Sequence, residues 1–274
     1  MKIAIMSDIH SNGMSLKKAI LDAKQKKVDD FFFLGDLITD GIMDNEVLDM
    51  VHNTNGVIIR GNRENYILEI LKNDVSFNGF NNIRPLFYTK NHLTKDSLNK
   101  LLELPKCLLI KKDDMTFLLL HGDNPSINSV DNYEDLIKQY QFDVCLSGHT
   151  HKTKSVLYKG RQFLNPGSIG TPADQPFYTY GIYDTIEKSF TIQKLSTDTE
   201  YEQLKFSYLN SSYFEENPEW CSLILVGIKQ GKSVPGEFIK MVSKKAKEQK
   251  VKTADEYNNL WYECYDQIKK EYEL

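Results

Sequence analysis

Side chains that commonly bind metal ions recur in short polar clusters up to residue 151. The clusters are Asp8-Ile9-His10, Gly35-Asp36, Gly61-Asn62-Arg63-Glu64, His121-Gly122 and Gly148-His149-Thr150-His151. Four of the six histidines belong to them. Imidazole nitrogens combined with carboxylate and amide oxygens suit divalent transition metals such as Mn, Fe, Zn, Co and Ni, and the sequence does not choose among these ions.

Each cluster follows, or ends, a short apolar run that predicts a strand. We expect strands over residues 2–6, 30–34 and 57–59, alternating with helices over 14–27, 45–51 and 64–71. This alternation is typical of a parallel sheet with crossover helices, and the carboxyl ends of such strands line the binding crevice. The clusters should therefore meet at one edge of the sheet.

Spacing within the clusters predicts which side chains face the same ion. Side chains two apart in extended backbone point to the same side, so we expect Asp8 and His10 to act together, and His149 and His151 likewise. The other three ligand-type side chains each lie at the end of a predicted strand of their own: Asp36, Asn62 and His121. Seven ligands exceed the needs of one four-coordinate ion and fit two ions that share a carboxylate.

Beyond the third strand the regular alternation of predicted strands and helices ends. Residues 72–90 predict a loop-rich stretch at the border of the site. Further expected elements are helices over 94–103 and 132–141, a strand over 144–147, and hairpins over 107–120, 154–164 and 178–195. We expect a core domain, 1–198, and a helical C-terminal extension, 199–274. Its three or four helices, with Pro218 and Pro235 at helix starts, would pack on the core, cap it or dimerise, and the sequence does not separate these roles.

Composition, net charge and cysteine pattern limit the kinds of protein that this chain can be. The chain has 274 residues, of which 41% are hydrophobic and 26% charged, as in an ordinary globular protein. Its formal net charge of −4 gives no basic footprint, so we do not expect nucleic acid as a partner. The four cysteines form no Cys-x-x-Cys pair, which argues against a zinc ribbon or a disulfide framework. No signal peptide or membrane span is predicted, and we expect a cytoplasmic protein.

The clusters together resemble the calcineurin-like metallophosphoesterase superfamily, whose pattern is D-x-H, G-D, G-N-H-[DE], G-H or H-G, and G-H-x-H. Here these read DIH, GD, GNRE, HG and GHTH. The turn Asn165-Pro166-Gly167-Ser168 resembles the compact bacterial phosphodiesterase branch. The resemblance covers about residues 1–195 and implies an α/β fold, a two-sheet α/β sandwich of the metallophosphoesterase type, here with a C-terminal helical extension.

The resemblance also implies roles for individual residues. It places Asp8, His10 and His151 at a first metal ion, Asn62, His121 and His149 at a second, and Asp36 as the bridge. It implies a phosphoesterase that hydrolyses phosphodiesters by attack of a metal-bridging hydroxide, with Asp36, Asn62 and the residue at position 63 as catalytic residues. A phosphate-ester small molecule or a nucleotide would be the substrate.

One residue departs from the family pattern. Arg63 occupies the position of the histidine that contacts substrate and often protonates the leaving group. With a pKa above about 12, arginine is no practical general acid, but it can grip a phosphate oxygen. The competing interpretation is an ion pair with an acid such as Glu64. Asn12, in the loop after His10, is a second candidate for substrate binding, or else a helix cap.

Three other functions stay open at the level of sequence. A phosphomonoesterase would act on a nucleotide, a dinucleoside polyphosphate or a phosphoprotein. A nuclease of the same superfamily fits the acidic charge less well. Members of this fold that have lost metal ligands serve as binding scaffolds, but every ligand position is filled here. The natural substrate and a homo-oligomeric state are not readable from the sequence.

Overall fold

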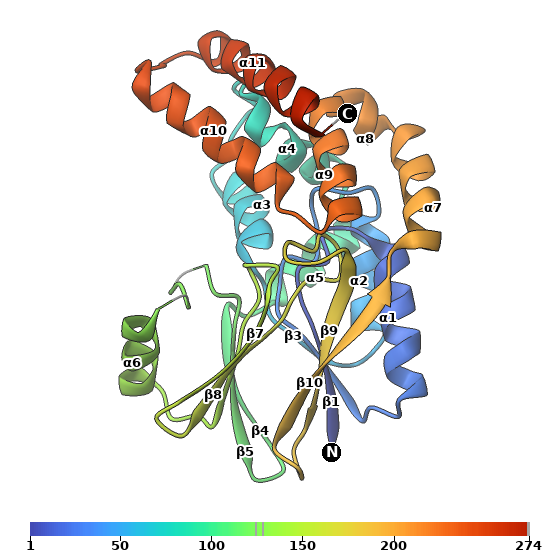
Figure 1. Cartoon of the computed structure of the whole chain (residues 1–274), viewed down its shortest axis with the longest axis vertical. Coiled ribbons are helices and arrows are strands. Elements are labelled where there is room, and N and C mark those ends of the chain that lie inside the picture. The colour runs from blue at the N-terminus through green and yellow to red at the C-terminus, as the bar shows by residue number, and fades with distance from the viewer. Residues whose placement is uncertain (124, 128, 273–274) are drawn as a thin grey trace.

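Two five-stranded sheets packed face to face form the core of the computed structural model (Figure 1). The structure describes residues 1–272 except 124 and 128, and for residues 199 and 200 it describes the backbone alone. The first sheet has the order β10-β9-β1-β2-β3 and the second β4-β5-β6-β8-β7. The strands are β1 (Lys2–Met6), β2 (Asp30–Phe33), β3 (Val57–Ile58), β4 (Cys107–Lys112), β5 (Met115–Leu120), β6 (Val144–Leu146), β7 (Thr153–Tyr158), β8 (Arg161–Pro166), β9 (Phe177–Asp184) and β10 (Ser189–Ser196).

The strand directions confirm the predicted α/β class. Strands β1, β2 and β3 are parallel to one another. Strand β9 pairs antiparallel with β1, and β10 pairs antiparallel with β9. In the second sheet β5, β6 and β8 are parallel, with β4 and β7 as antiparallel edges. Parallel neighbours need a crossover, which contains a helix between β1 and β2, between β2 and β3 and between β5 and β6, whereas strand β7 lies between β6 and β8 in the chain. The carboxyl ends of the parallel strands therefore point to the same end of each sheet.

Alternation along β1 builds the layers. Ile3 and Ile5 face the second sheet and pack in one buried cluster with residues of β5 such as Phe117. Ala4 and Met6 point the other way, into a cluster under the helices. Helix α1 (Gly13–Gln25) covers this outer face, and α6 (Val130–Gln139) covers the outer face of the second sheet (Figure 1).

The remaining helices of the core follow the predicted order with one exception. They are α2 (Asp44–His52), α3 (Asn62–Lys72), a 3₁₀ turn η1 (Asn81–Ile83), α4 (Arg84–His92) and α5 (Lys95–Glu103). The prediction that residues 72–90 are loop-rich is wrong for their second half, which is helical. Pro85 lies in the first turn of α4, where a backbone N–H would have no partner within the helix. Leu86, Phe87 and Tyr88 are buried residues of this helix.

The C-terminal extension holds five helices in its described part, more than the three or four expected. They are α7 (Asp198–Leu209), α8 (Ser212–Glu216), α9 (Pro218–Gln230), α10 (Val234–Glu248) and α11 (Ala254–Tyr272). Pro218 begins α9 and Pro235 lies in the first turn of α10, as predicted. The two overlooked helices lack a simple signal, since α8 is a single short turn and the apolar residues of α7 do not form one stripe.

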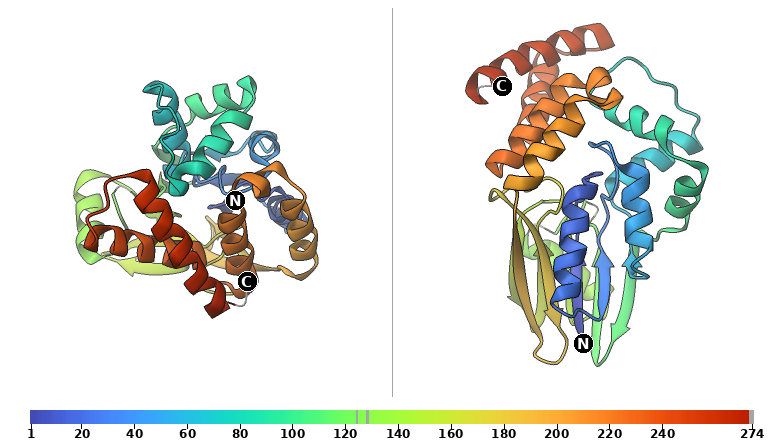
Figure 2. Two further views of the ribbon diagram at one scale, coloured as in Figure 1. Left: turned by 90° about the horizontal axis from the view of Figure 1, so that it is seen from above. Right: turned by 90° about the vertical axis from the view of Figure 1, so that its right-hand side faces the viewer.

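The extension lies over the end of the sheets opposite the N-terminus, which is the end where the parallel strands finish (Figures 1 and 2). One buried cluster contains residues of β1, α1 and the loop after β2 together with Tyr208, Trp220 and Ile224 of the extension. The extension thus packs on the core, while a separate domain boundary at residue 198 stays a prediction. Among the residues described, no helix combines the length and hydropathy that crossing a bilayer needs.

Candidate metal centre

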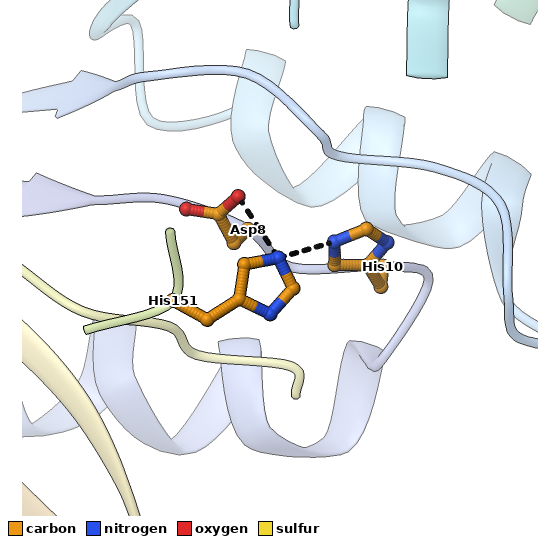
Figure 3. A group of neighbouring side chains, drawn as sticks. All are labelled: Asp8, His10 and His151. Carbon is orange, nitrogen blue, oxygen red and sulfur yellow. Dashed lines mark hydrogen bonds and ion pairs between the residues drawn. The ribbon is translucent and has the colours of Figure 1, made fainter. Parts of the chain in front are cut away.

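The seven ligand-type side chains gather at the end of the sheets beneath the extension. Asp8, His10 and His151 form one set, and Asp36, His121 and His149 form another, with the ligand atoms of each set within 4.8 Å of one another. Figure 3 shows the first set, in which His151 Nε2 lies 3.3 Å from Asp8 Oδ1 and 3.2 Å from His10 Nε2. Segments separated by 141 residues therefore present donors to one point.

Asp36 belongs to the second set and also lies next to the first. Its Oδ2 is 3.7 Å from His10 Nε2 and 3.3 Å from His121 Nε2. Asn62 completes the second set, since its Oδ1 lies 3.1 Å from His121 Nε2 and 3.0 Å from His149 Nδ1. The geometry thus brings together all seven residues that the sequence singled out.

Extended backbone does not explain this convergence, and that part of the prediction is wrong. Asp8, His10, His149 and His151 have left-handed φ angles of 54°, 47°, 66° and 58°, and Asp36 has 50°. Tight turns after the strands aim the side chains. Such a conformation costs a non-glycine residue roughly 1–3 kcal/mol, although aspartate and histidine tolerate it better than most. Strain of this kind concentrates at functional sites.

Buried Glu64 holds the turn that carries Asp36. Its carboxylate accepts the N–H groups of Asp36, Leu37, Ile38 and Gly61 at 3.0, 2.8, 3.2 and 2.6 Å. Two glycines let these segments touch: a Cβ on Gly35, whose φ is +87°, would lie 2.3 Å from the nitrogen of Gly61, and one on Gly61 would lie 2.3 Å from Asp36 Oδ1. Glu64 is therefore a positioning residue.

Three of the histidine rings direct an unprotonated nitrogen toward the centre, as a cation site requires. The Nδ1–H of His10 donates to Asp40 Oδ2 at 3.1 Å, that of His151 to the Thr171 carbonyl at 2.7 Å, and that of His121 to the Leu34 carbonyl at 2.7 Å. In each neutral ring the Nε2 then carries a lone pair toward the centre. The nitrogens of His10 and His151 meet this way at 3.2 Å, and a cation between them would relieve the repulsion.

Charge interactions at the centre favour positive charge on His121, whereas burial and the charge of His121 lower the pKa of His149. Burial alone lowers the pKa of His121, but the carboxylates of Asp36 and Asp8 outweigh burial and raise it to about 10. Burial raises the pKa of Asp36, yet His121, His10 and Arg63 together hold it well below its usual value. Two buried carboxylates this close need compensating positive charge, and the donor set fits divalent metal ions.

Asp40 connects the centre to Arg63 and to the extension. Its Oδ2 accepts from His10 and pairs with Arg63 Nη2 at 2.8 Å, while its Oδ1 accepts the indole N–H of Trp220 at 2.9 Å. The Tyr208 hydroxyl donates to the Asp40 carbonyl at 2.9 Å. The predicted partner of Arg63, Glu64, is the wrong acid, because the Glu64 carboxylate is occupied by backbone N–H groups.

Asn12 lies outside the wall of the cavity beside the centre. Its Oδ1 accepts the Ser15 N–H at 3.2 Å, which caps α1, and its Nδ2 donates to the Gly170 carbonyl at 3.3 Å. The side chain is buried and engaged at both ends. Of the two interpretations of Asn12, the geometry favours the helix cap over substrate binding.

Sequence reasoning missed several residues that position the ligands. The amide of Asn165 donates to the Gly148 carbonyl at 2.6 Å, and the hydroxyl of Ser168 donates to the Asp8 carbonyl at 2.7 Å. The turn that had served only as a family signature thus fixes the loops of Asp8 and His149. For Glu64 the signal was present in the GNRE cluster. For Asp40 and Trp220 no local pattern pointed to the centre.

Comparison with known proteins identifies the family of this chain. Residues 1–188 match the calcineurin-like phosphoesterase superfamily domain. The chain belongs to this superfamily. It is therefore a metal-dependent phosphoesterase, a hydrolase acting on phosphoric ester bonds.

Individual proteins are similar to this chain in sequence or in fold. The uncharacterized protein MJ0912 of Methanocaldococcus jannaschii is 29% identical over 218 residues, which span 70% of this phosphoesterase and 85% of MJ0912. A metallophosphoesterase from Sphaerobacter thermophilus has a TM-score of 0.67 at 21% identity, covering 83% of this chain and 98% of that one. Protein PH1004 of Pyrococcus horikoshii has a TM-score of 0.68 at 17% identity, covering 84% and 98%. At these identities the two structures establish the fold alone.

Proposed function

We propose that this phosphoesterase works with two divalent transition-metal ions, Mn, Fe, Zn, Co or Ni. Asp8, His10 and His151 would hold one ion, Asn62, His121 and His149 the other, and Asp36 would bridge them. The position of Asp36 Oδ2, 3.7 and 3.3 Å from a histidine nitrogen of each set, carries the proposal. Donors about 2.1 Å from a shared ion lie roughly 3.0–3.4 Å apart, so both gaps are close to those of a shared site.

The chain's own residues have separate tasks in this proposal. When bound, the ions supply the Lewis acidity that lowers the pKa of a water molecule and offsets phosphoryl charge. Arg63, at the cavity wall, would bind a phosphoryl oxygen with a guanidinium N–H that Asp40 leaves free. Asp40 would keep both Arg63 and the ring of His10 in place.

Replacement of the bridge tests the two-metal proposal. In Asp36→Asn we expect fewer than the two ions per chain of the wild type, and kcat/KM lower by at least about 100-fold, because loss of a mere supporting partner already costs roughly 10–100-fold. Mass spectrometry of protein purified without chelator measures the ions. Asp135→Asn, at an exposed site paired with Lys138, is the control. Less than one ion per wild-type chain would favour the scaffold alternative.

We further propose phosphodiesters as the preferred substrates. In support, a cavity of about 340 Å³ runs from the ligand side chains to α9 and α10 and leaves room for a second ester group. With Mn²⁺ added, kcat/KM should be higher for bis-p-nitrophenyl phosphate than for p-nitrophenyl phosphate. The reverse order would support the phosphomonoesterase alternative.

We also propose a cytoplasmic location. The four cysteines, Cys107, Cys145, Cys221 and Cys264, are free thiols, as is usual in a reducing compartment. Fluorescence microscopy of the tagged full chain tests this location. A homo-oligomeric state stays a prediction, and light scattering tests it.

A further inference from the structure

The cavity beside the metal centre has two chemically different halves. Its floor is the ligand set, with His10, Asp36, Asn62 and the two histidines of the GHTH cluster. Its opposite wall comes from the extension, through α9 and α10. Since Trp220 also bonds to Asp40, this wall is fixed to the floor through a buried contact. A substrate held by its phosphoryl group at the floor would therefore touch the wall with the rest of the molecule.

The wall is apolar where it faces the floor. Trp220, Ile224 and Ile228 of α9 are buried side chains that line the cavity, and half-buried Ile239 of α10 lines it from the other helix. The indole N–H of Trp220 is used by Asp40, so Trp220 offers the cavity carbon rather than a donor. Polar groups of the extension, Lys232, Ser233 and Lys240, are exposed residues at the cavity.

This distribution selects among ester groups. A sugar placed against the four apolar side chains would lose water from its hydroxyls without regaining hydrogen bonds, which costs free energy for each unpaired group. An alkyl or aryl group of the same size loses nothing and buries apolar surface. The acidic residues that line the cavity, Asp36 and Asp40, lie at the floor, so no described carboxylate of the wall disfavours a phosphate ester.

We infer that the α9–α10 wall is a binding subsite for a small apolar ester group, and that the substrates are phosphate esters of alkyl or aryl alcohols rather than of sugars. The inference rests on the proposed function, because it places the phosphoryl group at the metal centre. The cavity of about 340 Å³ admits a group the size of one or two rings. Ile239, the half-buried member of the apolar wall, is the specificity-determining residue.

Binding of phosphonates to the Mn²⁺-loaded full chain tests the inference without relying on turnover. Each probe carries one organic group, so its phosphonate marks the floor and the group marks the wall. By calorimetry we expect phenylphosphonate to bind roughly 10-fold tighter than methylphosphonate, as burial of a ring in an apolar site predicts. Propylphosphonate should bind several-fold tighter than 2-hydroxyethylphosphonate, which has the same size and one hydroxyl.

A matched pair of variants ties the effect to the wall. Ile239→Asn should weaken phenylphosphonate roughly 5–10-fold and leave methylphosphonate unchanged, because only the larger group reaches the wall. Ile137→Asn makes the same change at a half-buried position of α6, away from the cavity, and should alter neither. Ile239→Ala replaces the first variant if that one does not fold.

Two outcomes are distinct. Equal affinities for the phenyl and methyl probes, or for the propyl and hydroxyethyl probes, would overturn the apolar subsite and leave the proposed function standing. A metal-loaded protein that binds none of the phosphonates and hydrolyses neither p-nitrophenyl ester would overturn the proposed function, and the subsite with it.

Discussion

Arg63 is the residue at which this phosphoesterase departs from the pattern of its superfamily. Its side chain is about three-quarters buried, with an exposure of 24%, and its guanidinium pairs with Asp40, which also holds His10. Arginine keeps its charge at every working pH, so the position offers a fixed cation rather than a proton. Substrate binding and support of Asp40 are therefore both consistent with its place, and kinetics can separate them.

Truncation of Arg63 should weaken substrate binding more than turnover. In Arg63→Ala we expect KM to rise roughly 10–100-fold, the equivalent of one charge-assisted hydrogen bond of about 1.5–3 kcal/mol, with a smaller change in kcat. Arg63→Lys should recover part of the loss, since it keeps the charge without the fork. Steady-state kinetics with bis-p-nitrophenyl phosphate measure both constants.

The double variant Asp40→Asn/Arg63→Ala is the control for the effect on Asp40. If Arg63 acts only by neutralising Asp40, the second substitution should restore KM. Unchanged KM and kcat in Arg63→Ala alone would rule out the binding role.

At the scale of elements, the loops after β1 and β2 are tied to helices that lie behind them. Asp44 begins α2, and its Oδ1 accepts the Thr39 N–H at 2.8 Å and the Ser11 hydroxyl. Burial raises the pKa of Asp44 to about 6, and the hydrogen bonds from Ser11 and Thr39 oppose this only partly. A buried carboxyl here therefore makes the fold sensitive to pH through a residue outside the metal ligands.

Asp44→Asn should remove one pH-dependent part of the stability. Between its ordinary pKa of 3.8 and about 6, the folded protein holds a proton at Asp44 that the unfolded chain has released. This contribution is complete below pH 3.8 and is lost as pH rises through 6, which amounts to about 2 kcal/mol between pH 4.5 and 7.

Urea unfolding in chelator measures this effect at both pH values. The free energy of unfolding of the wild type relative to Asp44→Asn should fall by that amount from pH 4.5 to 7. A difference between the two proteins that does not change with pH would contradict the prediction.

Helix α9 reaches the centre through one hydrogen bond. Trp220→Phe keeps a ring in the core and removes the N–H that Asp40 accepts. Among the described residues, the Asp40 carboxylate then keeps three of its four side-chain partners, His10, Arg63 and Thr39. We expect kcat/KM to fall roughly 3–10-fold, in line with one neutral-to-charged hydrogen bond shared with a supporting residue.

Trp261→Phe is the matched control, because the Trp261 indole N–H is buried without a partner. Both substitutions remove the same atoms from the same buried cluster. Equal kcat/KM in the two variants would show that the bond to Asp40 plays no part in catalysis.

At the scale of the whole molecule, the metal centre joins both sheets, and the extension closes over it. Ligands come from the ends of β1, β2, β5 and β6 and from the start of α3, so metal binding should stabilise the complete fold. At 100 times the Kd, bound metal adds about 2.7 kcal/mol, which is roughly 5–10 °C in Tm for a chain of this length.

Calorimetric scans with chelator and with Mn²⁺ check this prediction. Asp36→Asn should show a much smaller shift than the wild type, whereas Asp135→Asn should show the full one. A Tm that is the same with chelator and with Mn²⁺ in the wild type would contradict the proposed centre.

The sequence by itself determined the parts of this protein that depend on local pattern. Period-two alternation and short apolar runs predicted all ten strands that the structure describes, and the residue types after those runs identified the seven side chains that the fold brings together. These signals are readable because strand formation and ligand chemistry depend on neighbouring residues. The departure at Arg63 was visible for the same reason.

Only the tertiary structure decided what surrounds those side chains. The left-handed turns at Asp8 and His10 are held by backbone contacts with the loop of Asp36, and Trp220 reaches Asp40 across 180 positions of the chain. The helix over 84–92 and the use of the extension as a cavity wall likewise depend on distant packing. Contacts between residues far apart in the chain leave no period in the sequence, so its local patterns could identify the ligands but not the pocket built around them.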